Sequence, residues 1–240
     1  MSLPFVSFLC PTFGRPPEEI QLLNEKVFWF SQQDYPKHLL ELVIVTDAPG
    51  QMLVCNVRGV RIIHHPVKIA TLGDKRNVLI GHAKGDVLLV DDDDDISLPG
   101  RAAQAADKLS DADWYDPGCR WFQPGKFDSL VMDDKNCTHH ACAYRKLPSI
   151  VYPSITKEED QWISSWARSE SHKRNLRGKF ERLDDPKKLQ YIYRWGVSRN
   201  HLSGKSNMQA DWDNRPARPG TFEIVPVMYR NYVQEIKNHS

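Results

Sequence analysis

Apolar and polar residues alternate in blocks along the first 110 residues of the chain. Short apolar runs that end at Pro, Gly or Asp predict buried strands, and longer stretches with apolar side chains three or four residues apart predict helices. On this basis we expect strands at residues 5–10, 42–45, 60–63 and 87–90, and helices at residues 18–33, 71–83 and 101–109. This alternation favours an α/β fold, with a mostly parallel sheet flanked by helices.

The second half of the chain has a less regular pattern. Residues 114–144 are rich in aromatic side chains and short strand-like pieces, and residues 158–169 carry an apolar helical face behind Thr156, a candidate N-cap. Toward the end we expect a strand at 189–193, a loop at 200–219, a strand at 222–227 and a helix at 229–237. The length of 240 residues fits one large α/β domain, or one domain with a modest appendage.

The composition is that of an ordinary globular protein, with 40% hydrophobic and 26% charged residues. No apolar run approaches the ~18 residues that a membrane-spanning helix needs, and the N-terminus lacks the basic region of a signal peptide. We therefore expect a cytoplasmic protein without a membrane anchor of its own. The five cysteines are odd in number and widely spread, which argues against a disulfide framework.

The net charge of +1 hides an asymmetry along the chain. Residues 168–205 carry eleven Lys or Arg against four Asp or Glu, a net charge of +7, which leaves −6 for the rest. An acidic body with a basic C-terminal third suggests a site that handles both a metal ion and anions.

Five consecutive aspartates, Asp91 to Asp95, directly follow the apolar run at residues 87–90. Like charges about 4 Å apart repel by roughly 1 kcal/mol in water and roughly 4 kcal/mol at an effective dielectric constant near 20. No segment within several residues of the run supplies enough positive charge to offset this repulsion. A divalent cation would offset it, and Mg²⁺ or Mn²⁺ held by carboxylates usually also binds a phosphate. The alternative interpretation is a solvated acidic loop.

Thr12 and Asp47 also lie just beyond the ends of expected strands. Ligands of such sheets bind beyond the carboxyl ends of the strands, so we expect both residues to converge with the aspartates in one cleft. The first strand is not followed by a G-x-G-x-x-G sequence, which argues against an ordinary dinucleotide-binding fold.

Six short segments follow one another in a recognisable order. The first three are Cys10 to Arg15, a Pro-Thr-aromatic-x-Arg turn; Ser31 to Pro36 with the strand and aspartate at Glu41 to Asp47; and Thr71 to Asn77, which contains G-x-x-R-N. The last three are Asp92 to Pro99, a D-x-D-D-x-x-x-P sequence; the pair Glu159-Asp160; and Tyr193 to Ser203. In this order they resemble the motifs of family 2 glycosyltransferases, which are enzymes of GT-A fold that use nucleotide sugars. The resemblance covers roughly residues 4–205.

The resemblance implies that residues 1–110 form a nucleotide-sugar-binding half and residues 111–240 an acceptor-binding half of the same GT-A domain. It implies a UDP-sugar as donor, with Asp47 at the uracil or ribose and with Lys75 and Arg76 along the diphosphate. The donor-binding residues that it implies are Thr12, Arg15, Asp47, Lys75, Arg76, Asp92 and Asp93.

The resemblance also implies that Mn²⁺ or Mg²⁺ bridges the two phosphates and stabilises the leaving nucleotide. Asp94 is the expected main ligand, Asp92 reaches the metal or the ribose, and His201 contacts the metal or the diphosphate. Asp160 is the implied general base, which takes the proton of the acceptor hydroxyl during in-line attack and inversion of the anomeric carbon. At a helix start the dipole lowers the pKa of a carboxyl group, which weakens Asp160 as a base.

Each of these residues also has a purely structural interpretation. In that interpretation Asp47 is a turn residue, and Lys75 and Arg76 lie on a solvated helix face. Asp160 is then a carboxylate at a helix start without a chemical role, and His201 is a neutral surface histidine. A zinc site is the alternative for Cys119, Cys137, His139, His140 and Cys142. It is disfavoured because the residues from 137 to 142 alternate as in a strand and point to opposite faces. Three tryptophans have two interpretations, stacking on a sugar or base and burial in the core: Trp114, Trp121 and Trp195.

The acceptor is left open between two classes. The basic segment with its aromatic residues suits a polyanion, and short transferases of this kind act on hydroxymethylated bases in phage-type DNA, which requires base flipping. Synthesis of cell-envelope material or polysaccharide is the common role of the family. Outside glycosyl transfer, the alternatives are a nucleotidyltransferase, disfavoured because residues 10–17 contain only one glycine, and a non-catalytic nucleotide-sugar-binding module. The oligomeric state is not indicated.

Overall fold

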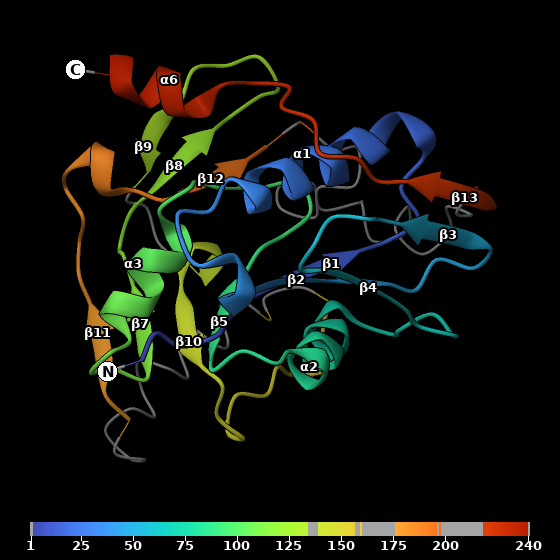
Figure 1. The fold of residues 1–240 in the computed structure, drawn as a ribbon, viewed down its shortest axis with the longest axis horizontal. Coiled ribbons are helices and arrows are strands. Elements are labelled where there is room, and N and C mark those ends of the chain that lie inside the picture. Colours follow the sequence, from blue (N-terminus) through green and yellow to red (C-terminus); the bar gives the residue numbers. More distant parts are fainter. Residues whose placement is uncertain are drawn as a thin grey trace.

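The computed structural model describes residues 2–133, 139–156, 159, 176–195, 197 and 218–239. A central sheet of seven strands forms its core (Figure 1). The strands are β1 (Val6–Thr12), β2 (Leu40–Thr46), β4 (Val60–His64), β5 (Val87–Val90), β7 (Trp114–Asp116), β10 (Ala143–Arg145) and β11 (Gly178–Phe180). They lie in the order β11-β7-β10-β5-β1-β2-β4, and β10 alone runs antiparallel to both of its neighbours among these described strands.

Helices cover both faces of this sheet, and the alternation of side chains along β1 shows why. Phe8 packs in a cluster with residues of α1 (Ile20–Ser31) and α3 (Arg101–Lys108). Its neighbour Leu9 packs on the opposite face with residues of α2 (Leu72–His82). All seven residues of β1 and of β2 are buried, as expected for parallel strands covered on two sides. The mixed α/β fold with a mostly parallel sheet is therefore confirmed.

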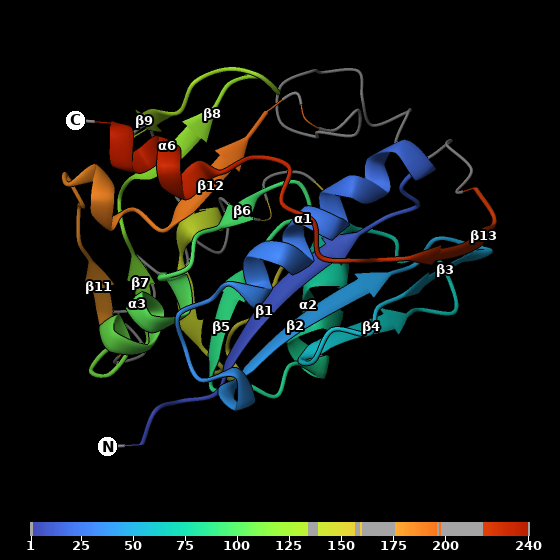
Figure 2. The same cartoon turned by 45° about the horizontal axis from the view of Figure 1, so that its top comes forward.

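A second sheet lies at one end of the central sheet, under the last helix (Figures 1 and 2). It has the order β6-β12-β8-β9, and a separate pair joins β13 to β3. The bounds are β3 (Gln51–Val54), β6 (Ile96–Ser97), β8 (Arg120–Gln123), β9 (Val131–Asp133), β12 (Tyr191–Arg194), β13 (Gly220–Glu223) and α6 (Tyr232–Asn238). Short 3₁₀ turns are η1 (Pro17–Glu19), η2 (Lys37–Leu39), η3 (His139–Ala141) and η4 (Pro186–Lys188).

Three details of the sequence-based prediction were wrong. The strand expected at 222–227 is β13, which ends at Glu223. The first strand does not stop at Pro11 but continues to Thr12. Strand β5 pairs with β1 only as far as Leu9, so among the described strands none pairs with this edge of β1 at Pro11, where a residue without an N–H group is tolerated. The alternating strand assumed for residues 137–142 is also wrong, because residues 139–141 form the turn η3 and the strand begins only at Ala143.

The helix expected at 158–169 and the loop expected at 200–219 fall almost entirely outside the described residues. Within the part of the chain that the structure describes, no helix has both the length and the apolar character needed to span a membrane.

Candidate active site

The five aspartates after β5 each have different partners. Asp91 is fully buried and accepts hydrogen bonds from Lys26 Nζ at 2.7 Å, Ser97 Oγ at 2.6 Å and Arg101 Nη1 at 3.2 Å. Lys26 belongs to α1 and Arg101 to α3, so this carboxylate joins two helices to the end of the central sheet. Its place in the core, with two cations on it, makes Asp91 a structural residue.

Asp93 turns toward the end of β1. Its carboxylate accepts hydrogen bonds from Thr12 Oγ1 at 2.5 Å and from Arg15 through Nε at 2.8 Å and Nη2 at 2.5 Å. Arg15 also forms an ion pair with Glu19 at 3.0 Å. Burial alone would lower the pKa of Arg15, but Asp93, together with Asp94 and Glu19, raises that pKa, so the guanidinium stays charged.

Asp47, at the end of β2, pairs with Lys75 in the first turn of α2. Lys75 Nζ lies 2.6 Å from Asp47 Oδ1 and also donates to the carbonyl oxygen of Thr12 at 3.0 Å. Asp47 Oδ2 accepts from the N–H of Ile69 at 2.8 Å. Burial lowers the pKa of Lys75, although Asp47 opposes this effect. The expected convergence of Thr12, Asp47 and the aspartates at the carboxyl edge of the sheet is thus confirmed, and Lys75 links two of them.

The start of α2 explains the glycine of the G-x-x-R-N sequence. Thr71 caps the helix, and its side chain accepts a hydrogen bond from the N–H of Asp74 at 3.1 Å. At Gly73 a Cβ atom would lie 1.9 Å from the carbonyl oxygen of Pro153, and the Gly73 N–H donates to Ile155 at 3.1 Å. Only glycine allows this segment to pack against the helix start that carries Lys75 and Arg76.

Asp92 lies between Arg76 and His140. Arg76 donates two parallel hydrogen bonds to the Asp92 carboxylate, at 2.9 and 3.2 Å, and its Nε contacts Glu159 at 3.2 Å. His140 Nδ1 lies 3.2 Å from Asp92 Oδ2. Burial would raise the pKa of Asp92, but the charge of Arg76 and the contact with His140 hold it well below its usual value. Asp92 is therefore ionised.

Asp95 faces the second sheet. Its carboxylate accepts from the Tyr191 hydroxyl at 2.6 Å and from the N–H of Arg194 at 2.8 Å. Burial and the neighbouring Asp94 raise the pKa of Asp95 to about 6. Asp94 is itself buried, and its carbonyl oxygen accepts a hydrogen bond from Arg194 Nε.

These contacts correct the charge argument made from sequence. Four cations from helices and turns elsewhere in the chain form ion pairs with Asp91, Asp92 and Asp93: Arg15, Lys26, Arg76 and Arg101. A count of charges near the run could not find them, because three of the four precede it by many residues. The chain itself therefore offsets part of the repulsion, at Asp91, Asp92 and Asp93.

The geometry nevertheless provides a group of metal-type ligands. Among the described residues, Asp92, Asp95 and His140 each offer one ligand atom, and these atoms lie within 4.8 Å of one another. Two carboxylates and an imidazole fit a divalent ion such as Mn²⁺. Asp94 is not part of this group, and His201 and Asp160 lie outside the described residues. The sequence interpretation considered His140 only as a ligand of the zinc alternative, and disfavoured it there because it placed residue 140 in a strand.

An aromatic cluster lies beside His140 on the second sheet. The imidazole stacks on Tyr193 with ring centres 4.9 Å apart, and the Arg120 guanidinium lies 4.2 Å from the same ring. Phe122 and Trp195 complete the cluster. Trp195 is 38% exposed, whereas Trp114 and Trp121 belong to the core as the structural interpretation held.

The cysteines of the zinc alternative are not brought together. Cys119 and Cys142 form no disulfide and lie in two different hydrophobic clusters. Cys137 lies outside the described residues, and His139 is fully buried, with Nε2 2.8 Å from the Tyr152 hydroxyl. Burial lowers the pKa of His139 well below its usual value, which keeps the imidazole neutral.

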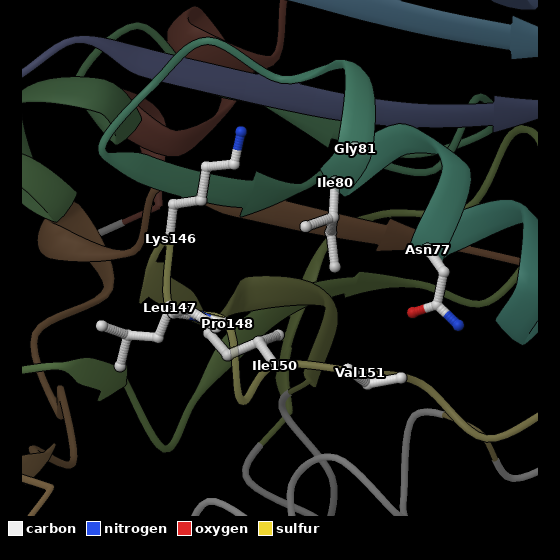
Figure 3. A pocket seen from close by; sticks show the side chains of 8 residues that line it. All are labelled: Asn77, Ile80, Gly81, Lys146, Leu147, Pro148, Ile150 and Val151. Atoms are coloured by element: carbon white, nitrogen blue, oxygen red, sulfur yellow. The ribbon is translucent and has the colours of Figure 1, made fainter.

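A cavity of about 490 Å³ opens between α2 and the chain that follows β10 (Figure 3). Its lining is formed mainly by aliphatic side chains, and the polar side chains of Lys146 and Asn77 also contribute to it. The lining residues are Asn77, Ile80, Gly81, Lys146, Leu147, Pro148, Ile150 and Val151. None of the candidate site residues lines this cavity.

Comparison with solved structures finds proteins of the same fold. Residues 1–349 of TarS from S. aureus in complex with UDP-GlcNAc match with a TM-score of 0.60 and 16% identity, over 87% of this chain and 63% of that one. The same protein in complex with UDP matches with a TM-score of 0.57 and 17% identity, over 79% and 60%.

The mannosyltransferase PcManGT from Pyrobaculum calidifontis, in complex with GDP-Man and Mn²⁺, matches with a TM-score of 0.55 and 15% identity, over 82% and 58%. The chain thus spans less than two thirds of the length of these proteins. The likeness shows that the fold is the expected GT-A fold. No family model and no curated protein matches the sequence.

Proposed function

We propose that this chain is a glycosyltransferase that moves a sugar from a UDP-sugar to an acceptor hydroxyl, with inversion, as in family 2. The observation that carries the proposal is the convergence of Thr12, Asp47, Lys75, Arg76 and the aspartate run at the carboxyl edge of the sheet. Proteins of the same fold have been solved with UDP-GlcNAc and with GDP-Man.

The donor would bind over residues 1–110. Asp47 offers a carboxylate to the uracil or ribose beside Thr12 and Arg15, and it is held in place by Lys75 and the backbone of Ile69. Arg76 supplies a buried, permanently charged group for the diphosphate, because Asp92 raises its pKa well above the usual value against the opposing effect of burial. Arg76 holds Asp92 and Arg15 holds Asp93, which supports a place for both carboxylates at the donor.

A divalent cation, Mn²⁺ or Mg²⁺, would stabilise the negative charge that develops on the leaving nucleoside diphosphate. Asp92 would hold it, together with a further carboxylate of the run. The resemblance implies Asp94 and His201 as its companions. Arg76 and its contact with Asp92 would orient the carboxylate toward the ion.

Residues 111–240 would bind the acceptor, with Asp160 as the general base. Glu159 contacts Arg76 at 3.2 Å, so the chain passes beside the aspartate run one residue before position 160. This contact supports the role of Asp160, which would take the proton from the attacking hydroxyl.

Two acceptor classes follow from different features. The net charge of +7 over residues 168–205 and the exposed Trp195 support a hydroxymethylated base of DNA, which would be flipped out and stacked. A glycan of the cell envelope or another polysaccharide is the second class, because exposed aromatic rings also stack on sugars. If DNA is the acceptor, its affinity falls steeply as salt concentration rises; a flat salt response would exclude DNA.

The test is a screen of nucleotide sugars against hydroxymethylated DNA, plain DNA and glycans, with mass spectrometry of the products and calorimetric titration of UDP. We expect transfer from one UDP-sugar, loss of transfer in EDTA, and loss of UDP binding in Asp94→Ala. The exposed Asp86, just before β5, provides a matched control as Asp86→Ala. A chain that binds no nucleotide and transfers no sugar would refute the proposal.

A further inference from the structure

His140 is held in one orientation by its surroundings. It belongs to the turn η3, is buried, and its ring lies nearly parallel to that of Tyr193, at an angle of 9°. Tyr193 is fixed in turn by its place on β12 and by the guanidinium of Arg120. An imidazole held this rigidly presents its ring nitrogens in fixed positions.

The imidazole lies beside two carboxylates of the aspartate run, Asp92 and Asp95. Its Nδ1 lies 3.2 Å from Asp92, and the ligand atoms of Asp92, Asp95 and His140 lie within 4.8 Å of one another. Ligands that bind one ion at about 2.0–2.2 Å lie at most about 4.4 Å apart, so small side-chain shifts would close the group around a metal.

Each of the two carboxylates has partners that would orient it as a ligand. Arg76 donates two hydrogen bonds to Asp92, and the Tyr191 hydroxyl and the Arg194 N–H donate one each to Asp95. Hydrogen bonds of this kind commonly support the ligands of protein metal sites. Each carboxylate oxygen retains a lone pair that a metal can use.

We propose that His140 is the nitrogen ligand of the divalent cation, together with Asp92 and Asp95. This proposal deepens the proposed function, because the ion is the one invoked there. Mg²⁺ is bound in proteins mainly through carboxylates, phosphates and water, whereas an imidazole ligand suits a transition ion. The site therefore prefers Mn²⁺ to Mg²⁺, and the nitrogen of His140 is the reason.

The first experiment measures binding of MnCl₂ and MgCl₂ to the protein alone by calorimetry. His140→Gln should weaken Mn²⁺ binding by about tenfold or more, a loss typical of a disturbed metal site, and should change Mg²⁺ binding much less. The control is His82→Gln, an exposed histidine at the end of α2. The rival variant is His201→Gln. Unchanged Mn²⁺ affinity in a folded His140→Gln protein, or a loss only in His201→Gln, overturns the proposal.

The second experiment does not depend on the His140 variant folding. Pulsed electron paramagnetic resonance of Mn²⁺ bound to the unaltered protein should show coupling to a ¹⁴N nucleus, and the coupling should persist in His201→Gln. Absence of nitrogen coupling, or its loss in His201→Gln, overturns the assignment. Both experiments use metal alone, so failure of the protein to use any nucleotide sugar would refute the proposed function without deciding this point.

Discussion

The pair formed by Lys26 and Asp91 permits a quantitative test of what stabilises the aspartate run. The two side chains are 2% and 1% exposed, and the ammonium lies 2.7 Å from the carboxylate. Substitution Lys26→Met keeps the length of the side chain and removes its charge. Asp91 then retains Ser97 and the more distant Arg101, at 3.2 Å, as partners.

Removing one partner of a buried ion pair costs about 3–5 kcal/mol, because the other charge stays buried without full compensation. For a chain of this size, each kcal/mol lowers the melting temperature by about 2–4 °C. We therefore expect a loss of roughly 3 kcal/mol, the lower end of that range because Arg101 remains, and a fall of about 6–12 °C.

The assay is equilibrium unfolding in urea together with a thermal melt. The control Lys237→Met removes an exposed lysine of α6 and should change stability by less than about 0.5 kcal/mol. The double variant Lys26→Met with Asp91→Leu should not recover the loss, since it leaves the buried guanidinium of Arg101 without its carboxylate partner. If Lys26→Met alone unfolds within 1 kcal/mol of the unaltered protein, the reasoning about Asp91 is wrong.

Three further outcomes are expected. Burial would raise the pKa of Glu41, but hydrogen bonds from the Ser7 hydroxyl and the Lys84 N–H lower it. The ionised Glu41 therefore stabilises the folded protein above the pKa that the group has in the unfolded chain, and this stabilisation is lost as the pH falls through its folded pKa. In Glu41→Gln the deficit in melting temperature should thus be full at pH 7 and shrink in acid; a deficit that does not vary with pH contradicts this. Asp160→Asn should keep UDP affinity and lose transfer, and full turnover there would remove its role as base. Trp195→Ala should raise the KM for the acceptor roughly tenfold through lost stacking, leaving UDP affinity unchanged; an equal effect in Phe127→Ala, at another exposed ring, would count against a specific subsite.

The elements with strong periodicity could be predicted from the sequence. The apolar runs of β1, β2 and β5 and the helical spacing in α1 and α2 each reflect burial on a defined face, so the pattern and the structure agree. Strands such as β9 and β11 contain three residues each, too few for a period to be recognised. The convergence of the strand ends followed from the parallel topology alone.

The partners of the aspartates could not be predicted. Lys26 lies in α1 next to the apolar face, and nothing in its local sequence distinguishes it from a solvent-exposed lysine. The contact of His140 with Asp92 depends on a 3₁₀ turn at residues 139–141, where the sequence suggested an alternating strand. Both misses concern contacts between segments that are distant in sequence, which no local pattern encodes.

The distribution of partners along the aspartate run has a consequence for length variation. Deleting the first or the last of the five residues yields one and the same polypeptide, because the letters are identical. Asp91 is nevertheless built into the core between two helices, whereas Asp95 meets the tyrosine hydroxyl of β12. A chain with four aspartates would therefore lack either the carboxylate between the two helices or the one that meets β12. We expect a protein shortened in this way to be inactive, although its composition is almost unchanged.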